Sequence, residues 1–393
     1  MRRADLAFST ATAGSLALIA MGPLARRIEM IGEDDLSRIW AGVRAVVLGR
    51  DPYDPATWAA TAAALGTQTP DTPVYIYPPW VAVPLLPLGL VPLPLVSILW
   101  LVASLAAAIV ATRAALRAWL PDRTADHAVA AVALLLSWVG MLTLVIGQWG
   151  YLLVAALFTS ILALGQGRPV VAGLAAAAMM AKPQLFLLTA PALAAHALWP
   201  ERPGGRPPRA GAVAMLVALG SAVALVAIGW IALPSWWPAW PQLVGGQQTR
   251  PFSDTLPALL LTIGGPSAVL LSPLVLLALV AVALRFHPRG DGWLPVWMVA
   301  SIASAPYTNS YDQILLFVPI ILAAGALRGR SPQRSRAVLW LGAAVLLVLT
   351  PLMYEVALLR RSETLGALVT LTVFAIVAGS LWPWRRDPGS VPP

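Results

Sequence analysis

Residues 93–113 read LPLVSILWLVASLAAAIVATR, and this stretch decides the class of fold. Within this stretch no charged side chain precedes Arg113, so the run reaches the ~20 apolar residues that a helix needs to cross a bilayer. Similar runs recur along the chain, in which 59% of residues are hydrophobic and only 11% are charged. We therefore predict an all-α polytopic membrane protein with about 12 transmembrane helices and no separate soluble domain.

Charge and cysteine usage narrow the function classes. The net charge of +9 comes from arginines in short loops, which is a signal of membrane orientation and gives no indication of nucleic-acid binding. The chain has no cysteine, which excludes disulfides and thiolate metal sites. The three histidines, His127, His196 and His287, are far apart in sequence, so we expect no metal site and no cofactor. Abundant arginine and alanine are typical of a GC-rich bacterium.

The placement of arginines predicts the topology. Arginine-rich segments occur at 113–123, 168, 202–209, 285–289, 328–336 and 385–386. They alternate with arginine-poor turns at 147–149, 182, 233–254 and 306–312. Cytoplasmic loops carry the excess of arginine, so the first set is assigned to the inside and the second to the outside. The segment 354–363 departs from the pattern, because arginines and glutamates occur together in this loop.

The alternation leaves no membrane crossing for residues 77–91. This segment contains Pro78, Pro79, Pro84 and Pro87, and proline removes a backbone donor and breaks helices. We predict a re-entrant or peripheral segment on the outer side. The alternative is a short, broken spanning helix, which would invert the assignments that follow.

The first outer loop, 26–75, is acidic and contains seven of the 17 acidic residues. Apolar residues at helical spacing over 36–47 predict an amphipathic helix along the membrane surface, ended by Gly49. A second helix is predicted to start at Asp54-Pro55. Asp35 is expected to cap the first helix, and a carboxylate fixed there is also suited to general-base catalysis, with Asp34 as the alternative. The pair Asp34-Asp35 is also an alternative cation site.

Lys182 is the only lysine, and it lies within the apolar stretch 173–191. The helices predicted at 169–181 and 293–305 are too short to cross ~30 Å of hydrocarbon, so Lys182 and the turn 306–312 are expected to share a depth. Backbone without helix is tolerated there only around a cavity. The predicted cavity is lined by Lys182, Gln184, Asn309, Tyr311 and Asp312. An alternative is a lysine that extends to the lipid headgroups.

Three blocks of residues resemble glycosyltransferase family 87 in the same order. The first block is Asp35-Leu36, Trp40, Gly49, Pro52-Tyr53 and Tyr77-Pro78-Pro79. The second is Gly147-Gln148, Gly150-Tyr151-Leu152, Arg168-Pro169, Ala172-Gly173-Leu174 and Lys182-Pro183-Gln184. The third is Pro306-Tyr307, Tyr311-Asp312 and Pro319. The resemblance covers residues 30–325. Some members carry a histidine where this chain has Tyr311-Asp312, so a role for histidine is not expected there.

The resemblance implies a multi-spanning enzyme of the C superfamily of glycosyltransferases, which uses polyprenyl-phosphate sugars. Asp35 would be the catalytic base, with Lys182 at the donor phosphate. Candidate substrate-binding residues are Gln148, Gln184, Asn309, Tyr311, Asp312, Tyr53 and Tyr77. The aromatic side chains among them also fit an interfacial aromatic belt.

The expected partners are a polyprenyl-phosphate sugar donor, a lipid or glycan acceptor and membrane lipids, with no nucleic acid. Mannose is the first expectation for the sugar and arabinofuranose the second. The expected location is the plasma (inner) membrane, with the active site facing the periplasm or cell exterior.

The predicted organisation is one integral membrane domain, 1–393. It consists of a first transmembrane helix at 7–25, the outer loop at 26–75, a catalytic module at 76–325 and C-terminal helices at 326–393. A transporter or flippase of a lipid-linked sugar is the alternative, since transporters also use short broken helices near their sites. A transporter predicts related halves, and the sequence contains no internal repeat. A non-catalytic assembly partner in envelope synthesis is a third possibility.

Overall fold

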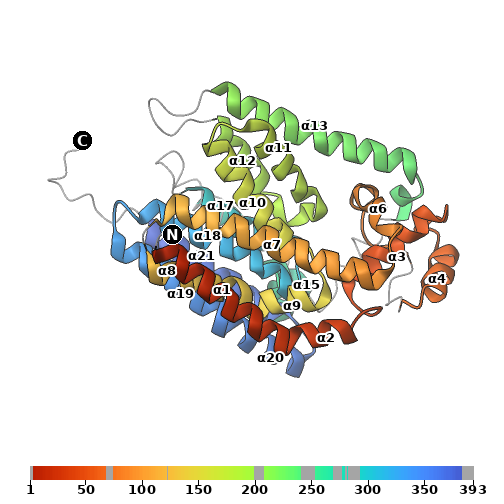
Figure 1. Cartoon of the computed structure of the whole chain (residues 1–393), viewed down its shortest axis with the longest axis horizontal. Coiled ribbons are helices and arrows are strands. Elements are labelled where there is room, and N and C mark those ends of the chain that lie inside the picture. Colours follow the sequence, from red (N-terminus) through yellow and green to blue (C-terminus); the bar gives the residue numbers. More distant parts are fainter. Residues whose placement is uncertain are drawn as a thin grey trace.

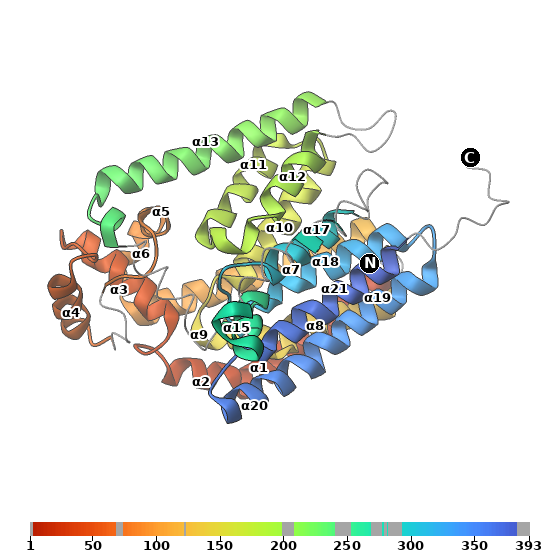
Figure 2. The ribbon, with the colours of Figure 1, turned by 180° about the vertical axis from the view of Figure 1, so that it is seen from behind.

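The computed structural model describes residues 3–67, 74–121, 123–198, 208–239, 253–268 and 293–382, together with residues 277, 278 and 281. Within these ranges every regular element is a helix and no strand occurs, as the sequence predicts (Figures 1 and 2). The all-α prediction is therefore confirmed for the described part of the chain. The arginine-rich segments 202–207, 285–289 and 385–386 and the outer segments 68–73 and 240–252 lie outside it.

The N-terminal segment is two helices rather than one. Helix α1 covers Arg3–Met21 and α2 covers Pro23–Glu29, so the predicted span 7–25 has the wrong boundaries. Pro23 has no backbone N–H to continue the hydrogen bonding of α1, and it occupies the first turn of α2, where that donor is not needed.

The acidic loop forms the two predicted helices, with one correction. Helix α3 covers Asp35–Val47 and α4 covers Pro55–Ala64. The N-cap of α3 is Asp34, whose carboxylate accepts a hydrogen bond of 2.8 Å from the Ser37 N–H. The prediction that Asp35 is the cap is wrong, because Asp35 already has helical geometry. Gly49 follows the C-cap with φ +70°, a conformation that favours glycine.

The proline-rich segment forms a chain of very short helices. Helix α5 covers Pro79–Ala82, η1 covers Val83–Leu85 and α6 covers Leu86–Gly89. At 1.5 Å per residue this segment is ~16 Å long, about half of the hydrocarbon thickness. Its length therefore favours the non-spanning alternative. The Trp80 indole N–H donates to the Met180 carbonyl at 2.8 Å, which fixes α5 beside the segment that carries Lys182.

Four consecutive helices follow the proline-rich segment. They are α7 (Leu93–Trp119), α8 (Thr124–Leu136), α9 (Trp138–Ile146) and α10 (Gly150–Gly165). Helix α1 packs along α8, and α10 packs along α7. Helices α8 and α9 form a pair bent by 43° at Ser137, whose side chain accepts from the Gly140 N–H and so begins α9.

The predicted short helix ends at Lys182. Helix α11 covers Pro169–Ala177 and continues as the 3-10 turn η2, Ala178–Ala181. After Lys182 the chain continues through the 3-10 turn η3, Pro183–Phe186, into α12, Thr189–Leu198. Helix α13, Pro208–Ala232, packs against α11 and α12 and reaches α5 (Figure 1).

The remaining elements include the second short helix, α17, which packs against α18 and α21. The described elements are α15 (Leu256–Ala268), α17 (Trp293–Ala303), η5 (Ser310–Leu316), α18 (Phe317–Leu327), α19 (Pro332–Ala344), η6 (Val345–Leu349), α20 (Thr350–Arg360), η7 (Thr364–Gly366) and α21 (Ala367–Leu381). The predicted loop 354–363 is mostly helix, because α20 extends to Arg360 before Arg361 adopts φ +52°.

The described residues do not confirm the predicted number of membrane spans. Among the described residues, six helices are long and apolar enough to cross a membrane, or seven if the bent α8–α9 pair counts as one span. Five shorter apolar helices, including 169–181 and 293–303, accompany them. A multi-pass membrane protein is therefore supported, whereas the count of about 12 is not confirmed.

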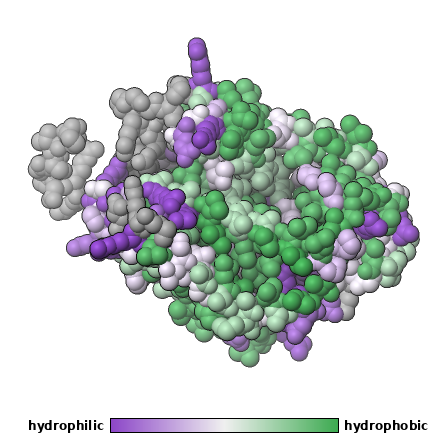
Figure 3. All heavy atoms as spheres, viewed as in Figure 1, coloured by the Kyte–Doolittle hydropathy of each residue, from purple (hydrophilic) through white to green (hydrophobic). Residues whose placement is uncertain are grey.

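The two ends of the helix bundle differ in composition. The start of α1 meets the end of α7 through Arg117 and Asp5 at 2.6 Å, and the start of α8 meets α19 through Arg123 and Ser335 at 2.8 Å. Figure 3 shows hydrophilic residues at this end and a broad hydrophobic surface across the middle. The turn after α9 and the loop before α3 lie at the opposite end (Figures 1 and 2).

Candidate active site

Asp34 and Arg27 form a buried ion pair at the entry to α3. The Arg27 Nη1 lies 3.0 Å from the Asp34 Oδ2, and both side chains are 2% exposed. Burial raises the pKa of the Asp34 carboxyl, although the Ser37 donors and the Arg27 charge favour its ionised form. Asp34 is therefore committed to capping and to this ion pair, and it has little freedom to act on a substrate.

Asp35 lies one residue further on and faces a different set of groups. Its Oδ2 accepts from the Gln148 Nε2 at 2.5 Å, and its Oδ1 accepts from the Arg38 Nη1 at 2.9 Å. The side chain is 14% exposed, in contrast to that of Asp34. A carboxylate has about four lone-pair positions, so two hydrogen bonds leave acceptor capacity for a third partner.

Gln148 is presented by the turn that ends α9. Gly147 adopts φ +69° at the C-cap of that helix, and Gln148 follows with its side chain buried. The Gln148 amide nitrogen lies 3.1 Å from the Tyr77 hydroxyl and 3.3 Å from the Tyr311 hydroxyl. Its two N–H groups therefore serve Asp35 and this tyrosine pair. The structure thus brings together four predicted site residues from four separate segments.

Lys182 is the centre of a second group. Its Nζ lies 2.5 Å from the Asp312 Oδ1 and 4.5 Å from the centroid of the Tyr311 ring. The Lys182 and Asp312 side chains are 7% and 2% exposed. The alternative of a lysine extended to the headgroups is therefore wrong, because the ammonium is paired inside the protein. Its contact with the ring is a cation–π interaction.

Asn309 and Tyr311 join the two groups. Asn309 is the N-cap of η5, and its backbone N–H donates to the Asp312 Oδ2 at 3.2 Å. Its side-chain amide donates to the Tyr311 hydroxyl at 2.8 Å. Tyr311 therefore lies between Gln148 at its hydroxyl and Lys182 at its ring face. These contacts bring the predicted residues 309–312 beside Lys182.

Two other predicted residues lie apart from this network. Tyr53 is 3% exposed, and its hydroxyl donates to the Tyr77 carbonyl, so it supports Tyr77 rather than offering an open ring face. Its ring packs against Tyr75 at 5.8 Å between centroids. These buried rings do not form the interfacial belt that the sequence also suggested. Gln184, partly exposed in η3, has no described hydrogen bond to the cluster.

Sequence reasoning missed an acidic group behind Asp312. Asp254 accepts from the Gln313 Nε2 at 2.5 Å and from the Thr308 hydroxyl, and Glu363 accepts from the Ser310 N–H at 3.1 Å. Burial raises the pKa of Asp254 well above its usual value and also raises the pKa of Glu363. Both lie at the edges of apolar segments, and the scarcity of acids in this chain was the available signal.

The arrangement of acids in the described ranges does not resemble a metal centre. No group of three or more histidine, aspartate or glutamate side chains there is placed to hold a metal ion. Asp34 and Asp35 point to different partners, Arg27 and Gln148 respectively, so they do not form a shared cation site.

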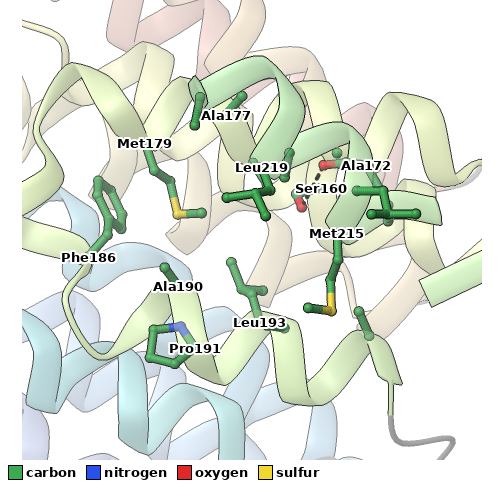
Figure 4. Close-up of a pocket in the computed structure, with 18 of the residues that line it drawn as sticks. Ser160, Ala172, Ala177, Met179, Phe186, Ala190, Pro191, Leu193, Met215 and Leu219 are labelled. Carbon is green, nitrogen blue, oxygen red and sulfur yellow. Dashed lines mark hydrogen bonds between the residues drawn. The ribbon is translucent and has the colours of Figure 1, made fainter. Parts of the chain in front are cut away.

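An apolar cavity of about 740 Å³ lies beside Lys182, between α10, α11, α12 and α13 (Figure 4). Met179, Met180 and Pro183 line it and flank Lys182 in sequence. Its lining is apolar apart from Ser160, whose hydroxyl donates to the Ala172 carbonyl at 3.0 Å. Residues next to Lys182 in the chain therefore border a space suited to a hydrocarbon chain, although Lys182 itself is not part of the lining.

The geometry combines the two groups that a transfer with an anionic leaving group requires. Asp35 is a carboxylate with free acceptor capacity, and Lys182 is a buried cation. Gln148 and Tyr311 connect them through hydrogen bonds and a ring contact. A base for an incoming hydroxyl and a positive charge for a departing oxyanion can thus act within one cluster.

Comparison with known proteins identifies the family. The family model for Glycosyltransferase family 87 matches residues 75–291, which is more than half of the chain. The matched range contains Tyr77, Gln148, Lys182 and Gln184, whereas Asp35 and residues 309–312 lie outside it. No curated protein and no solved structure matches this sequence. The chain belongs to glycosyltransferase family 87 and is a multi-pass membrane glycosyltransferase.

Proposed function

We propose that the enzyme transfers a sugar, mannose in the first instance, from a polyprenyl-phosphate donor to a lipid or glycan acceptor of the cell envelope. The reaction takes place at the outer face of the plasma membrane, on the periplasmic or exterior side, and inverts the anomeric configuration. Asp35 is the general base and Lys182 binds the donor phosphate.

One observation supports this proposal above the others. Asp35 and Lys182 are 147 positions apart in the printed sequence, yet Gln148 and Tyr311 link them in one buried network. The base and the cation are therefore connected through the hydrogen bond between Gln148 and Tyr311, an arrangement that favours concerted attack and departure.

The reaction step uses the two groups at opposite sides of the anomeric carbon. The acceptor hydroxyl attacks that carbon and its proton passes to Asp35. A bond forms from the acceptor oxygen to the anomeric carbon, and the bond to the phosphate oxygen breaks with its electron pair. The leaving polyprenyl phosphate gains negative charge, which Lys182 stabilises. Direct displacement of this kind inverts the configuration.

The state of Lys182 fits this role. An ammonium has three N–H donors, and only Asp312 is paired with it at hydrogen-bonding distance among the described side chains. Asp312 therefore fixes the position of the ammonium and leaves it donors for a phosphate oxygen. Lysine offers a compact point charge, which suits a phosphate that changes its charge during the reaction.

The choice of a lipid-linked donor rests on the apolar cavity. Met179, Met180 and Pro183 continue directly from Lys182 into the wall of that cavity. A donor with its phosphate at Lys182 can place the first part of its polyprenyl chain there, which removes apolar surface from water. We assign sugar contacts to Gln148, Asn309, Tyr311, Asp312 and Tyr77, with Tyr53 in support and Gln184 at the edge.

The decisive experiment measures transfer of radiolabelled mannose from polyprenyl-phosphate mannose by the purified protein. We expect transfer by the wild type and a loss of roughly 10²- to 10⁴-fold for Asp35→Asn, the range typical of a general base. The fold should survive, because the cap of α3 is Asp34 and not Asp35.

Two outcomes would contradict the proposal. Near-normal transfer by Asp35→Asn would remove the base assignment. Movement of intact donor across a bilayer without release of polyprenyl phosphate would indicate the transporter or flippase alternative. Polyprenyl-phosphate arabinofuranose in the same assay tests the second candidate sugar.

A further inference from the structure

Arg27 carries a charge and yet is almost fully buried, with 2% exposed. A buried guanidinium is costly unless hydrogen bonds and an opposite charge compensate it. Arg27 has both. Beyond the ion pair with Asp34, its Nη1 donates to the Leu144 carbonyl at 3.0 Å and the Val145 carbonyl at 2.9 Å. Its Nη2 donates to the Ser97 hydroxyl at 2.8 Å.

These partners belong to the segments that carry the candidate catalytic residues. Leu144 and Val145 are in the last turn of α9, where carbonyls lack the regular helical partner four residues on. Among the described backbone donors, only the Gly147 N–H at 3.3 Å reaches the Leu144 carbonyl. Gln148 follows three positions after Val145. Asp34 is the N-cap of α3, and Asp35 is the next residue. One guanidinium thus holds the end of the helix before Gln148 and the start of the helix that carries Asp35.

The packing around Gly147 shows how closely the guanidinium fits this turn. A Cβ on Gly147 would lie 2.8 Å from the Arg27 Nη1 and 2.6 Å from the Leu36 Cβ. The turn before Gln148 therefore touches both Arg27 and α3. A smaller or differently shaped cation would leave this contact looser.

We infer that Arg27 is a positioning residue for the transfer reaction, which acts by fixing the separation between Asp35 and Gln148. The inference rests on the proposed function, because it takes Asp35 as the base. The planar guanidinium supplies up to five N–H donors in fixed directions, whereas a lysine at this position would keep the charge and lose the bridge.

The test compares Arg27→Lys with Arg26→Lys. Arg26 is the matched control, since it is exposed and its ion pair among the described residues is with Glu29 at the surface, at 2.9 Å. We expect Arg27→Lys to lower kcat at least about tenfold, because a misplacement of about 1 Å can cost on the order of 10²-fold. Donor affinity should stay within about twofold of wild type, since the donor contacts assigned to Lys182 are untouched. Arg26→Lys should behave as wild type.

A second variant guards against a simple folding defect. The double change Arg27→Met with Asp34→Asn removes both buried charges and keeps a good N-cap. It should fold, bind donor and turn over slowly. In the Asp35→Asn background, Arg27→Lys should cause no further loss of rate, because a positioning residue has no effect once the group it positions is removed.

The outcomes separate the inference from the proposed function. Wild-type kcat in either Arg27 variant overturns the inference, and so does a loss that multiplies with that of Asp35→Asn. Failure of both Arg27 variants to fold also overturns it, because Arg27 would then support the whole fold. If Asp35→Asn itself transfers sugar normally, the base assignment fails, whatever the Arg27 variants do.

Discussion

At the scale of single residues, the environment of Lys182 explains how a single buried lysine is accommodated. Buried charges are usually paired, and here Asp312 supplies the opposite charge and the Tyr311 ring covers another side of the ammonium. The pair is nearly neutral without substrate. In the proposed mechanism an incoming phosphate would therefore meet a cation that Asp312 already orients.

This environment predicts the behaviour of substitutions at Lys182. Lys182→Met keeps the length and apolar stem of the side chain and removes its charge, so we expect transfer to fall by about 10²- to 10³-fold, as for loss of one preorganised electrostatic group. Lys182→Arg should recover only part of the rate, since a fork replaces a point charge. Rates and donor binding by the purified variants check this. Wild-type turnover in Lys182→Met would leave Lys182 with a structural role only.

At the scale of elements, helix ends present the site. Asp35 starts α3, Gln148 follows the end of α9, Lys182 lies between η2 and η3, and Asp312 belongs to the first turn of η5. Each position follows from a local signal in the sequence, such as a cap, a glycine, a proline or an interrupted apolar run. These local signals are why the sequence could single out these residues, and the structure places the four side chains in one contact network.

The contacts between those helix ends were not predictable in the same way. The Arg27 bonds to Ser97 and Leu144 join residues 70 and 117 positions apart. An arginine in a loop of a membrane protein is first a topology signal, and only tertiary packing shows that it is buried. The role of Asp34 was not predictable either. Two neighbouring aspartates are equally good N-cap residues, and only the first residue of the helix decides between them.

The turn between α9 and α10 gives a prediction at this scale. Gly147 and Gly167 both adopt positive φ, of 69° and 70°. In this left-handed backbone conformation, replacing glycine with alanine costs roughly 1–2 kcal/mol of stability at either position. Only at Gly147 would the added Cβ also collide, with Leu36 and Arg27, whereas nothing lies within 4 Å at Gly167. We expect Gly147→Ala to lose most transfer activity and more thermal stability than the control Gly167→Ala. Equal effects in thermal unfolding and transfer assays would show that the packing of Gly147 on α3 is unimportant.

At the scale of the whole molecule, the two ends of the bundle have different roles. The start of α1, the end of α7 and the start of α8 gather arginines at one end. Helix α3 and the turn after α9, which carry Asp35 and Gln148, lie away from this end (Figures 1 and 2), and Lys182 and Asp312 join them through Tyr311. Arginine spacing alone predicts that this end is cytoplasmic, because that prediction does not depend on knowing the packing. It did not fix the number of spans, since helices of 10–17 residues occur beside the long ones.

This polarity gives a test of the side on which the reaction occurs. The chain has no natural cysteine, so a single introduced thiol reports its own position. Ala59 is exposed on α4 near the candidate site, and Gly329 is exposed in the turn between α18 and α19 at the arginine-rich end. We expect an impermeant thiol reagent to label Ala59→Cys in intact cells and to label Gly329→Cys only after lysis. The reason is that arginine-rich loops stay in the cytoplasm during insertion, while the opposite ends are exported.

Labelling of Gly329→Cys but not Ala59→Cys in intact cells would place the site on the cytoplasmic side. The donor sugar would then have to reach Lys182 from that leaflet.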